Sequence, residues 1–88
     1  MLVARLETDT KYYEISILKD LLNDLVLVCH YGSKLTKFSQ RKNIVIDSVE
    51  AGLKLAEKNI KLRKRHKYKA VYLTPKLTLS EMLISQES

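Results

Sequence analysis

The residues best suited to chemistry in this 88-residue chain are cations that recur at regular spacing. Residues 33–42 form a polar segment whose cations are Lys34, Lys37, Arg41 and Lys42. Farther along, Lys54, Lys58, Lys61 and Arg65 follow one another at steps of four, three and four. Such steps place side chains along one stripe of a helix. Cations in this arrangement neutralise the phosphates of nucleic acids, so the pattern indicates a polyanionic partner.

Two interpretations of these residues stay open. Lysine-rich helix faces are often simply solvated, without any ligand. The five tyrosines can stack on sugars or bases, or they can pack as core and rim residues of strands. They are Tyr12, Tyr13, Tyr31, Tyr68 and Tyr72.

Residue types that support catalysis are present but scattered. Cys29 and His30 are adjacent, so along a strand their side chains point to opposite faces and form no nucleophile–base pair. His66 lies within a basic run, where we expect a surface or phosphate-contacting role. The sequence contains no glycine-rich phosphate loop, no paired-histidine zinc motif and no Cys-x-x-Cys. We therefore expect a protein that is not an enzyme and that needs neither a metal nor a cofactor.

Composition sets the class of protein. Hydrophobic residues make up 45% of the chain and charged residues 30%, a balance typical of one small globular domain. The single cysteine, Cys29, excludes an internal disulfide. Residues 1–7 do not resemble a secretory signal, and residues 25–29 are far shorter than the ~18 apolar residues of a membrane-spanning helix. We expect a cytoplasmic protein without a membrane partner, with a nucleoid-associated or nuclear location as the alternative.

The excess charge is concentrated in one segment. The formal net charge is +6, yet residues 54–69 hold eight basic residues against Glu57 alone, a net charge of +7. The first 33 residues are slightly acidic. Any electrostatic attraction to a polyanion should therefore centre on the second half of the chain.

The first half of the chain has the alternation of strands. Residues 12–18 place Tyr13, Ile15 and Ile17 on one face, and residues 25–31 are rich in β-branched and apolar side chains. The polar residues 19–24 between them predict a hairpin turn. Residues 42–46 form a third strand candidate and residues 2–7 a weaker fourth, while residues 68–73 read as a short strand or an extended segment.

One helix is predicted over residues 48 to about 64. Asp47 or Ser48 can cap its first turn. Its apolar stripe is formed by Val49, Leu53, Ala56 and Ile60. The fold class is therefore α+β, a small antiparallel sheet packed on one long basic amphipathic helix.

A break is predicted near Pro75, which divides a domain of residues 1–74 from a tail of residues 75–88. The spacing of residues 78–81 is that of a capping box, so the tail can hold a short helix over residues 79–85. Its apolar side chains must dock on the domain, on a protein partner or on a second copy of the chain. They are Leu77, Leu79, Met82, Leu83 and Ile84.

The order of these features resembles the WGR domain over residues 2–73. A Tyr-Tyr-Glu-Ile-Ser-Ile-Leu strand and a polar turn precede a strand that runs into Tyr31-Gly32-Ser33-Lys34-Leu35, followed by another strand and a long basic helix ending near Tyr68. In that family a small mixed sheet packs on one helix, and in poly(ADP-ribose) polymerases the domain contacts DNA ends. Tyr31 stands where the family has Trp, Ser33 where it has Arg, and Leu35 where a Gly usually follows. The resemblance implies that Tyr31 stacks on the ligand and that Gly32 lets the ligand approach, whereas Ser33 lacks the bidentate contacts of Arg.

The leading hypothesis is a non-catalytic nucleic-acid-binding module, for DNA rather than RNA and for a duplex or its ends. It would bind through phosphates with little sequence preference. The residues expected to carry binding are Tyr31, Gly32, Lys34, Lys37, Arg41, Lys42, Lys54, Lys58, Lys61 and Arg65. The alternative is a protein-interaction or oligomerisation module, acting as an adaptor or regulator.

Overall fold

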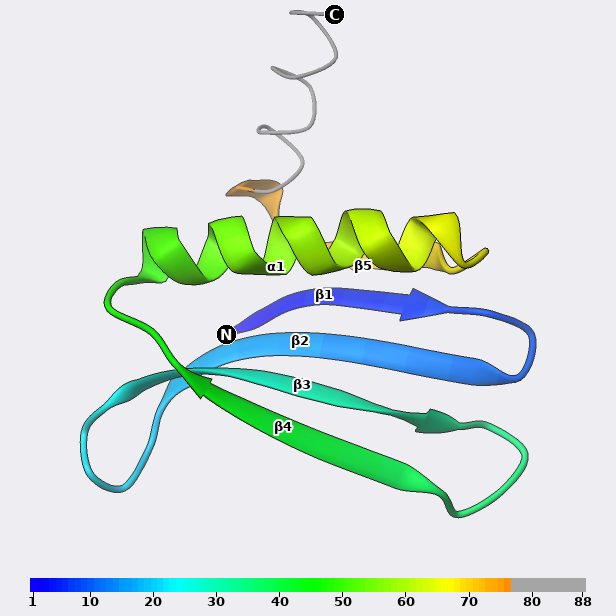
Figure 1. The fold of residues 1–88 in the computed structure, drawn as a ribbon, viewed down its shortest axis with the longest axis horizontal. Coiled ribbons are helices and arrows are strands. Elements are labelled where there is room, and N and C mark those ends of the chain that lie inside the picture. Colours follow the sequence, from blue (N-terminus) through cyan, green and yellow to red (C-terminus); the bar gives the residue numbers. More distant parts are fainter. Residues whose placement is uncertain (77–88) are drawn as a thin grey trace, which may run out of the picture.

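The computed structural model describes residues 1–76, which form an α+β fold of five antiparallel strands and a long helix (Figure 1). The elements in chain order are β1 (Leu2–Glu7), β2 (Lys11–Lys19), β3 (Leu25–Ser33), β4 (Ser39–Val45), α1 (Val49–Arg65) and β5 (Lys69–Leu73). The predicted fold class is confirmed, and residues 69–73 form a strand. The predicted tail helix and the apolar residues 77–84 lie outside the described residues.

The strands lie in the order β4-β3-β2-β1-β5. The first four are neighbours in sequence and in space, because short turns join them into a meander. The connection through α1 then carries the chain from one edge of the sheet to the other, where β5 pairs with β1. Strand β1 therefore lies between β2 and β5, so the strand that follows the helix pairs with the first strand of the chain.

The core lies between α1 and one face of the sheet. Tyr13, Ile15 and Ile17 of β2 are 4%, 0% and 4% exposed, as their alternation predicts. Their partners across the β2–β3 ladder extend the same face, and these are Tyr31, Cys29 and Leu27. Because paired residues point to the same side of a sheet, these side chains form one apolar layer beneath the helix.

The turn between β2 and β3 is held by an aspartate. The Asp20 Oδ1 atom accepts hydrogen bonds from the backbone N–H groups of Leu22 and Asp24, each at 2.9 Å. Asn23 adopts a φ of 67°, in the left-handed region that asparagine tolerates better than most residues. The polar turn predicted at residues 19–24 is confirmed, and it leaves Leu21 and Leu22 exposed at its tip.

Helix α1 begins at a serine cap and meets the sheet closely. The Ser48 Oγ atom accepts a hydrogen bond from the Ala51 N–H at 3.1 Å. Ala56 and Ile60 are buried against β1, β2 and β3. Gly52 is buried as well, and a Cβ atom there would lie 2.5 Å from Ile46 Cδ1, so this glycine permits the close approach of helix and sheet.

The end of α1 turns the chain back toward the sheet. The Lys67 N–H donates to the Lys64 carbonyl and the Tyr68 N–H donates to the Arg63 carbonyl, both at 3.2 Å. With Lys67 at a φ of 68°, this is a Schellman motif in which lysine occupies the position that glycine usually takes. It directs Tyr68 and β5 onto the sheet. Across residues 1–76 no helix combines the length and the apolar character needed to cross a membrane.

Candidate nucleic-acid interface

Three segments that are far apart in sequence meet at one end of the sheet (Figure 1). They are the β1–β2 turn, the β3–β4 loop and the residues that follow α1. The Lys34 N–H donates to the Thr10 carbonyl at 2.8 Å, which ties the loop to the turn. Within the turn, the Thr8 N–H donates to the Lys11 carbonyl at 2.9 Å. Backbone hydrogen bonds thus fix the positions of the side chains at this end.

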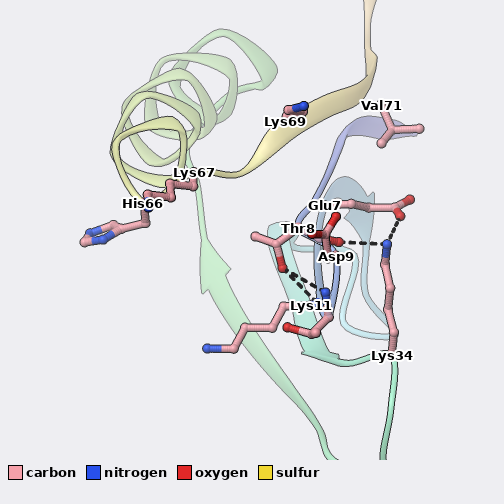
Figure 2. Close-up of a pocket in the computed structure, with 10 residues that line it drawn as sticks. Glu7, Thr8, Asp9, Lys11, Lys34, His66, Lys67, Lys69 and Val71 are labelled. Carbon is pink, nitrogen blue, oxygen red and sulfur yellow. Dashed lines mark hydrogen bonds and ion pairs between the residues drawn. The ribbon is translucent and has the colours of Figure 1, made fainter.

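An open groove of about 700 Å³ lies between these segments, and we call it the lysine groove. Its cationic side chains come from three separate segments: Lys11 from the start of β2, Lys34 from the β3–β4 loop, and Lys67 and Lys69 from the residues after α1, with His66 beside them. Its acidic side chains are Glu7 and Asp9. Figure 2 shows Lys34 reaching Glu7 on one side of the groove, while His66 and Lys67 lie at the end of α1. The convergence of four lysines gives the groove a net positive charge.

The carboxylate of Glu7 is neutralised within the protein. It forms ion pairs with Lys34 and with Arg5, and the Arg5 Nε atom lies 2.9 Å from Glu7 Oε2. The pKa of Glu7 is lowered, chiefly by the hydrogen bond from Lys34 and then by that from Arg5. The hydrogen bond to Glu7 in turn raises the pKa of Arg5, which also pairs with Glu14. Glu7 therefore positions Lys34 at the groove, and the Lys34 Nζ atom, which also donates to the Thr8 carbonyl at 2.9 Å, shares its charge with this carboxylate.

A second, smaller cavity of about 260 Å³ adjoins the lysine groove, and we call it the aromatic pocket. The residues that line it include the aromatic residues Tyr31, Phe38 and Tyr68 and the cationic Arg63. The remaining lining residues are Lys11, Gly32 and Ser33. Lys11 lines both cavities, so they adjoin at this residue.

Arg63 lies at the centre of a group of tyrosines. Its guanidinium carbon is 4.3 Å from the ring centroid of Tyr13, 5.9 Å from that of Tyr31 and 5.7 Å from that of Tyr68. The rings of Tyr13 and Tyr31 stack at 5.6 Å with an angle of 19° between their planes. Burial raises the pKa of Tyr13, so its hydroxyl stays protonated and neutral beneath the cation. The group holds an arginine at the wall of the pocket by cation–π contacts.

Tyr31 and Gly32, which the sequence predicted as ligand contacts, both lie at this end of the sheet, but the structure gives them different roles. Tyr31 lines the aromatic pocket, and its hydroxyl donates to Gln40 Oε1 at 2.8 Å. Gly32 is buried, and a Cβ atom there would lie 2.3 Å from the Phe38 carbonyl oxygen and 2.9 Å from Ser39 Cα. The close approach that requires this glycine is therefore made by the chain's own β3–β4 connection.

The predicted cations of the loop and of β4 do not share one surface. Lys34 lines the lysine groove and Lys37 is exposed in the loop. Arg41 and Lys42 are adjacent on β4, paired with His30 and Cys29, so their side chains point to opposite faces of the sheet. Of the four predicted residues, Lys34 is the one that the structure brings to the groove.

The predicted helix cations form a separate exposed stripe. They are Lys54, Lys58, Lys61 and Arg65, and all four are exposed. Lys61 pairs with Glu57 at 3.6 Å, four residues earlier. At a rise of 1.5 Å per residue, Lys54 lies roughly 16 Å along the helix axis from Arg65, the last residue of α1. The stripe extends the positive field, but most of it lies away from the lysine groove.

Sequence reasoning did not single out several residues of this surface: Lys11, Phe38, Arg63, Lys67 and Lys69. For Arg63, however, the sequence contains a signal that could have identified it. Arg63 follows Ile60 by three residues and so continues the apolar stripe of the helix, a position that faces the sheet. A cation at such a position must find a partner within the fold, and here the partners are tyrosine rings. The lysines carry no comparable signal, since they come from three segments that are far apart in the sequence.

The other candidate reactive residues are accounted for by packing. Cys29 is 2% exposed in the core, and His30 packs edge-on against Tyr12 with ring centroids 5.5 Å apart. Among residues 1–76 no three His, Cys, Asp or Glu side chains are grouped closely enough to hold a metal ion.

Comparisons with protein-family models, with curated proteins and with solved structures found no match to this chain.

Proposed function

We propose that the protein is a non-catalytic nucleic-acid-binding domain, for DNA rather than RNA, that contacts phosphates at the lysine groove with little sequence preference. The observation that carries the proposal is the convergence of Lys11, Lys34, Lys67 and Lys69 from three segments around one groove of about 700 Å³. Cations held by a folded scaffold lose less freedom on binding than cations on a mobile segment. The resemblance to the WGR domain stays a prediction from the sequence.

The basic last turn of α1 supports this location. Arg63, Lys64 and Arg65 precede the groove-lining residues His66 and Lys67 along the chain. Their charge adds to the field at the same end of the molecule, where it attracts a polyanion over the range of the Debye length, about 8 Å at physiological salt. The exposed stripe along α1 extends this field at longer range.

The proposal is tested by fluorescence anisotropy with a labelled 24-nucleotide DNA at several salt concentrations. If about four lysines contact phosphates, the logarithm of affinity should fall with the logarithm of salt with a slope of about −3 to −4. The variants Lys11→Glu and Lys69→Glu should weaken binding strongly. Lys54→Glu makes the same charge change far from the groove and should have a smaller effect. Absence of binding to DNA and RNA at low salt would contradict the proposal.

A protein-interaction module is the second candidate function, and the β2–β3 turn favours it. Leu21 is 105% exposed and Leu22 81% exposed at the tip of this turn, and Val45 is 69% exposed on the edge strand β4. Light scattering on the full chain and on a Leu21→Ser/Leu22→Ser variant tests this function. A dimer in the first and a monomer in the second would support it, and monomers in both would count against self-association.

A further inference from the structure

We propose that the aromatic pocket binds an unpaired base of a single-stranded nucleic acid while the lysine groove holds the adjoining phosphates. This inference rests on the proposed function and names the form of nucleic acid that the site selects. It differs from the sequence-based expectation of a duplex. The residues that carry it are Phe38, Arg63 and Tyr68, with Lys11 between the two cavities.

Phe38 presents an aromatic ring to solvent on a fixed backbone. Its side chain is 56% exposed although it lies in a polar loop. The Phe38 carbonyl accepts a hydrogen bond from the Ser33 N–H at 3.0 Å, and its own N–H donates to Thr36 Oγ1 at 3.2 Å. A ring carried on a backbone fixed in this way can stack on a base without ordering of the loop.

Arg63 supplies both a stacking plane and hydrogen-bond donors. The tyrosine group holds its guanidinium, and within residues 1–76 no carboxylate is paired with it. A guanidinium can stack on a base, and its N–H groups can donate to base acceptors or to phosphate oxygens. An arginine that lines a pocket without an acidic partner is suited to a planar, electron-rich or anionic ligand.

The size and position of the pocket favour an unpaired nucleotide. At about 260 Å³ it has room for a single planar ring system. A base inside a duplex is covered by its neighbours on both faces, so it offers only its edges to a protein. An unpaired base can turn its face toward Phe38 and Arg63. Because Lys11 lines both cavities, a phosphate attached to that base can lie in the lysine groove.

The experiment compares three labelled DNA probes of equal length by fluorescence anisotropy in one low-salt buffer. They are a 12-nucleotide thymidine strand, a 12-nucleotide abasic strand with the same phosphates, and a 12-base-pair duplex. We expect the thymidine strand to bind about tenfold more tightly than the abasic strand, since stacking of even one base gives an effect of this order. It should also bind more tightly than the duplex, although the duplex carries more charge.

The matched variants are Phe38→Ala and Leu35→Ala, in the same loop. Leu35 is 75% exposed and does not line the pocket. Phe38→Ala should reduce thymidine-strand binding to the level of the abasic strand, as should Phe38→Leu, which keeps an apolar side chain but removes the ring. Leu35→Ala should bind like the wild type, and all three should unfold at the wild-type urea concentration because both residues are exposed.

Equal affinity for the thymidine and abasic strands would overturn the inference and leave the proposed function standing. Tighter binding of the duplex, or full binding by Phe38→Ala, would overturn it as well. Absence of binding to all three probes would overturn the proposed function itself, so the two failures are distinguishable.

Discussion

The guanidinium of Arg63 lies over the ring of Tyr13, 4.3 Å from its centroid, where the last turn of α1 meets β2. Tyr13 is 4% exposed, so the cation rests on a ring that belongs to the core. The contact links the fold to the candidate site, because Tyr13 faces the apolar layer while Arg63 lines the aromatic pocket. The carboxyl end of the helix is thus attached to the sheet at the point where the proposed ligand binds.

Replacing Arg63 with Met should destabilise the protein by about 1 kcal/mol, because the cation–π contacts are lost while the apolar stem is retained. Arg65→Met, an exposed position in the same turn, is the matched control and should change the free energy of unfolding by less than about 0.5 kcal/mol. Urea unfolding measures both. Equal effects of the two variants would show that the tyrosine contacts of Arg63 do not stabilise the fold.

Lys67→Gly should stabilise the protein by about 0.5 kcal/mol. Lys67 has a φ of 68°, a conformation that is costly for a residue with a Cβ atom and free for glycine, although glycine also increases the entropy of the unfolded chain. Lys67→Ala removes the same charge and keeps the strained conformation, so it should not stabilise. Thermal unfolding of the two variants separates the backbone effect from the charge effect, and a higher stability of the alanine variant would contradict the assignment.

The two glycines should respond differently to substitution by alanine. At Gly32 a Cβ atom would meet backbone atoms of Phe38 and Ser39 at 2.3 and 2.9 Å, so Gly32→Ala should cost at least about 2 kcal/mol. At Gly52 it would meet the ends of the Ile46 and Ile17 side chains, which can move, while alanine favours the helix by about 0.5–1 kcal/mol. Gly52→Ala should therefore be much less destabilising, as measured by urea unfolding. Equal losses would show that the β3–β4 connection can shift to accept a side chain.

Acid should weaken the fold partly through Glu7. Because Lys34 and Arg5 lower its pKa, Glu7 binds a proton more weakly in the folded than in the unfolded protein. Its contribution is therefore present above the ordinary glutamate pKa of about 4.3 and is lost as the pH falls through the lowered folded value. Glu7→Gln should lose less thermal stability between pH 6 and pH 3 than the wild type does. High salt should narrow the difference in stability loss between Glu7→Gln and the wild type. Identical loss of thermal stability in the two proteins between pH 6 and pH 3 would contradict this role for the ion pairs.

Most of the fold follows from local patterns. The alternation of Tyr13, Ile15 and Ile17 assigns the buried face of β2, and the spacing of Ala56 and Ile60 assigns the buried face of α1. Ser48, one of the two residues predicted as possible caps, caps the helix. These features are predictable because side-chain direction in a strand or helix depends only on position within that element.

The site could be predicted only in part. Tyr31 and Lys34 were expected and lie at the two cavities, whereas Lys42 and Arg41 point to opposite faces of an edge strand. Phe38 gave no periodic signal, because it lies in a loop whose conformation depends on hydrogen bonds to Ser33 and Thr36.

The sequence by itself determined the four strands and the helix of residues 1–65, the buried faces of β2 and α1, and the concentration of positive charge in residues 54–69. The tertiary structure decided which cations meet, because it brings Lys11 and Lys34 to the same groove as Lys67 and Lys69. It also places the Arg63 guanidinium over the ring of Tyr13. The physical reason is that periodicity is a property of one element at a time. The meeting of three segments depends on the strand order β4-β3-β2-β1-β5 and on the Schellman turn after α1, which are set by packing and turn geometry across the whole domain.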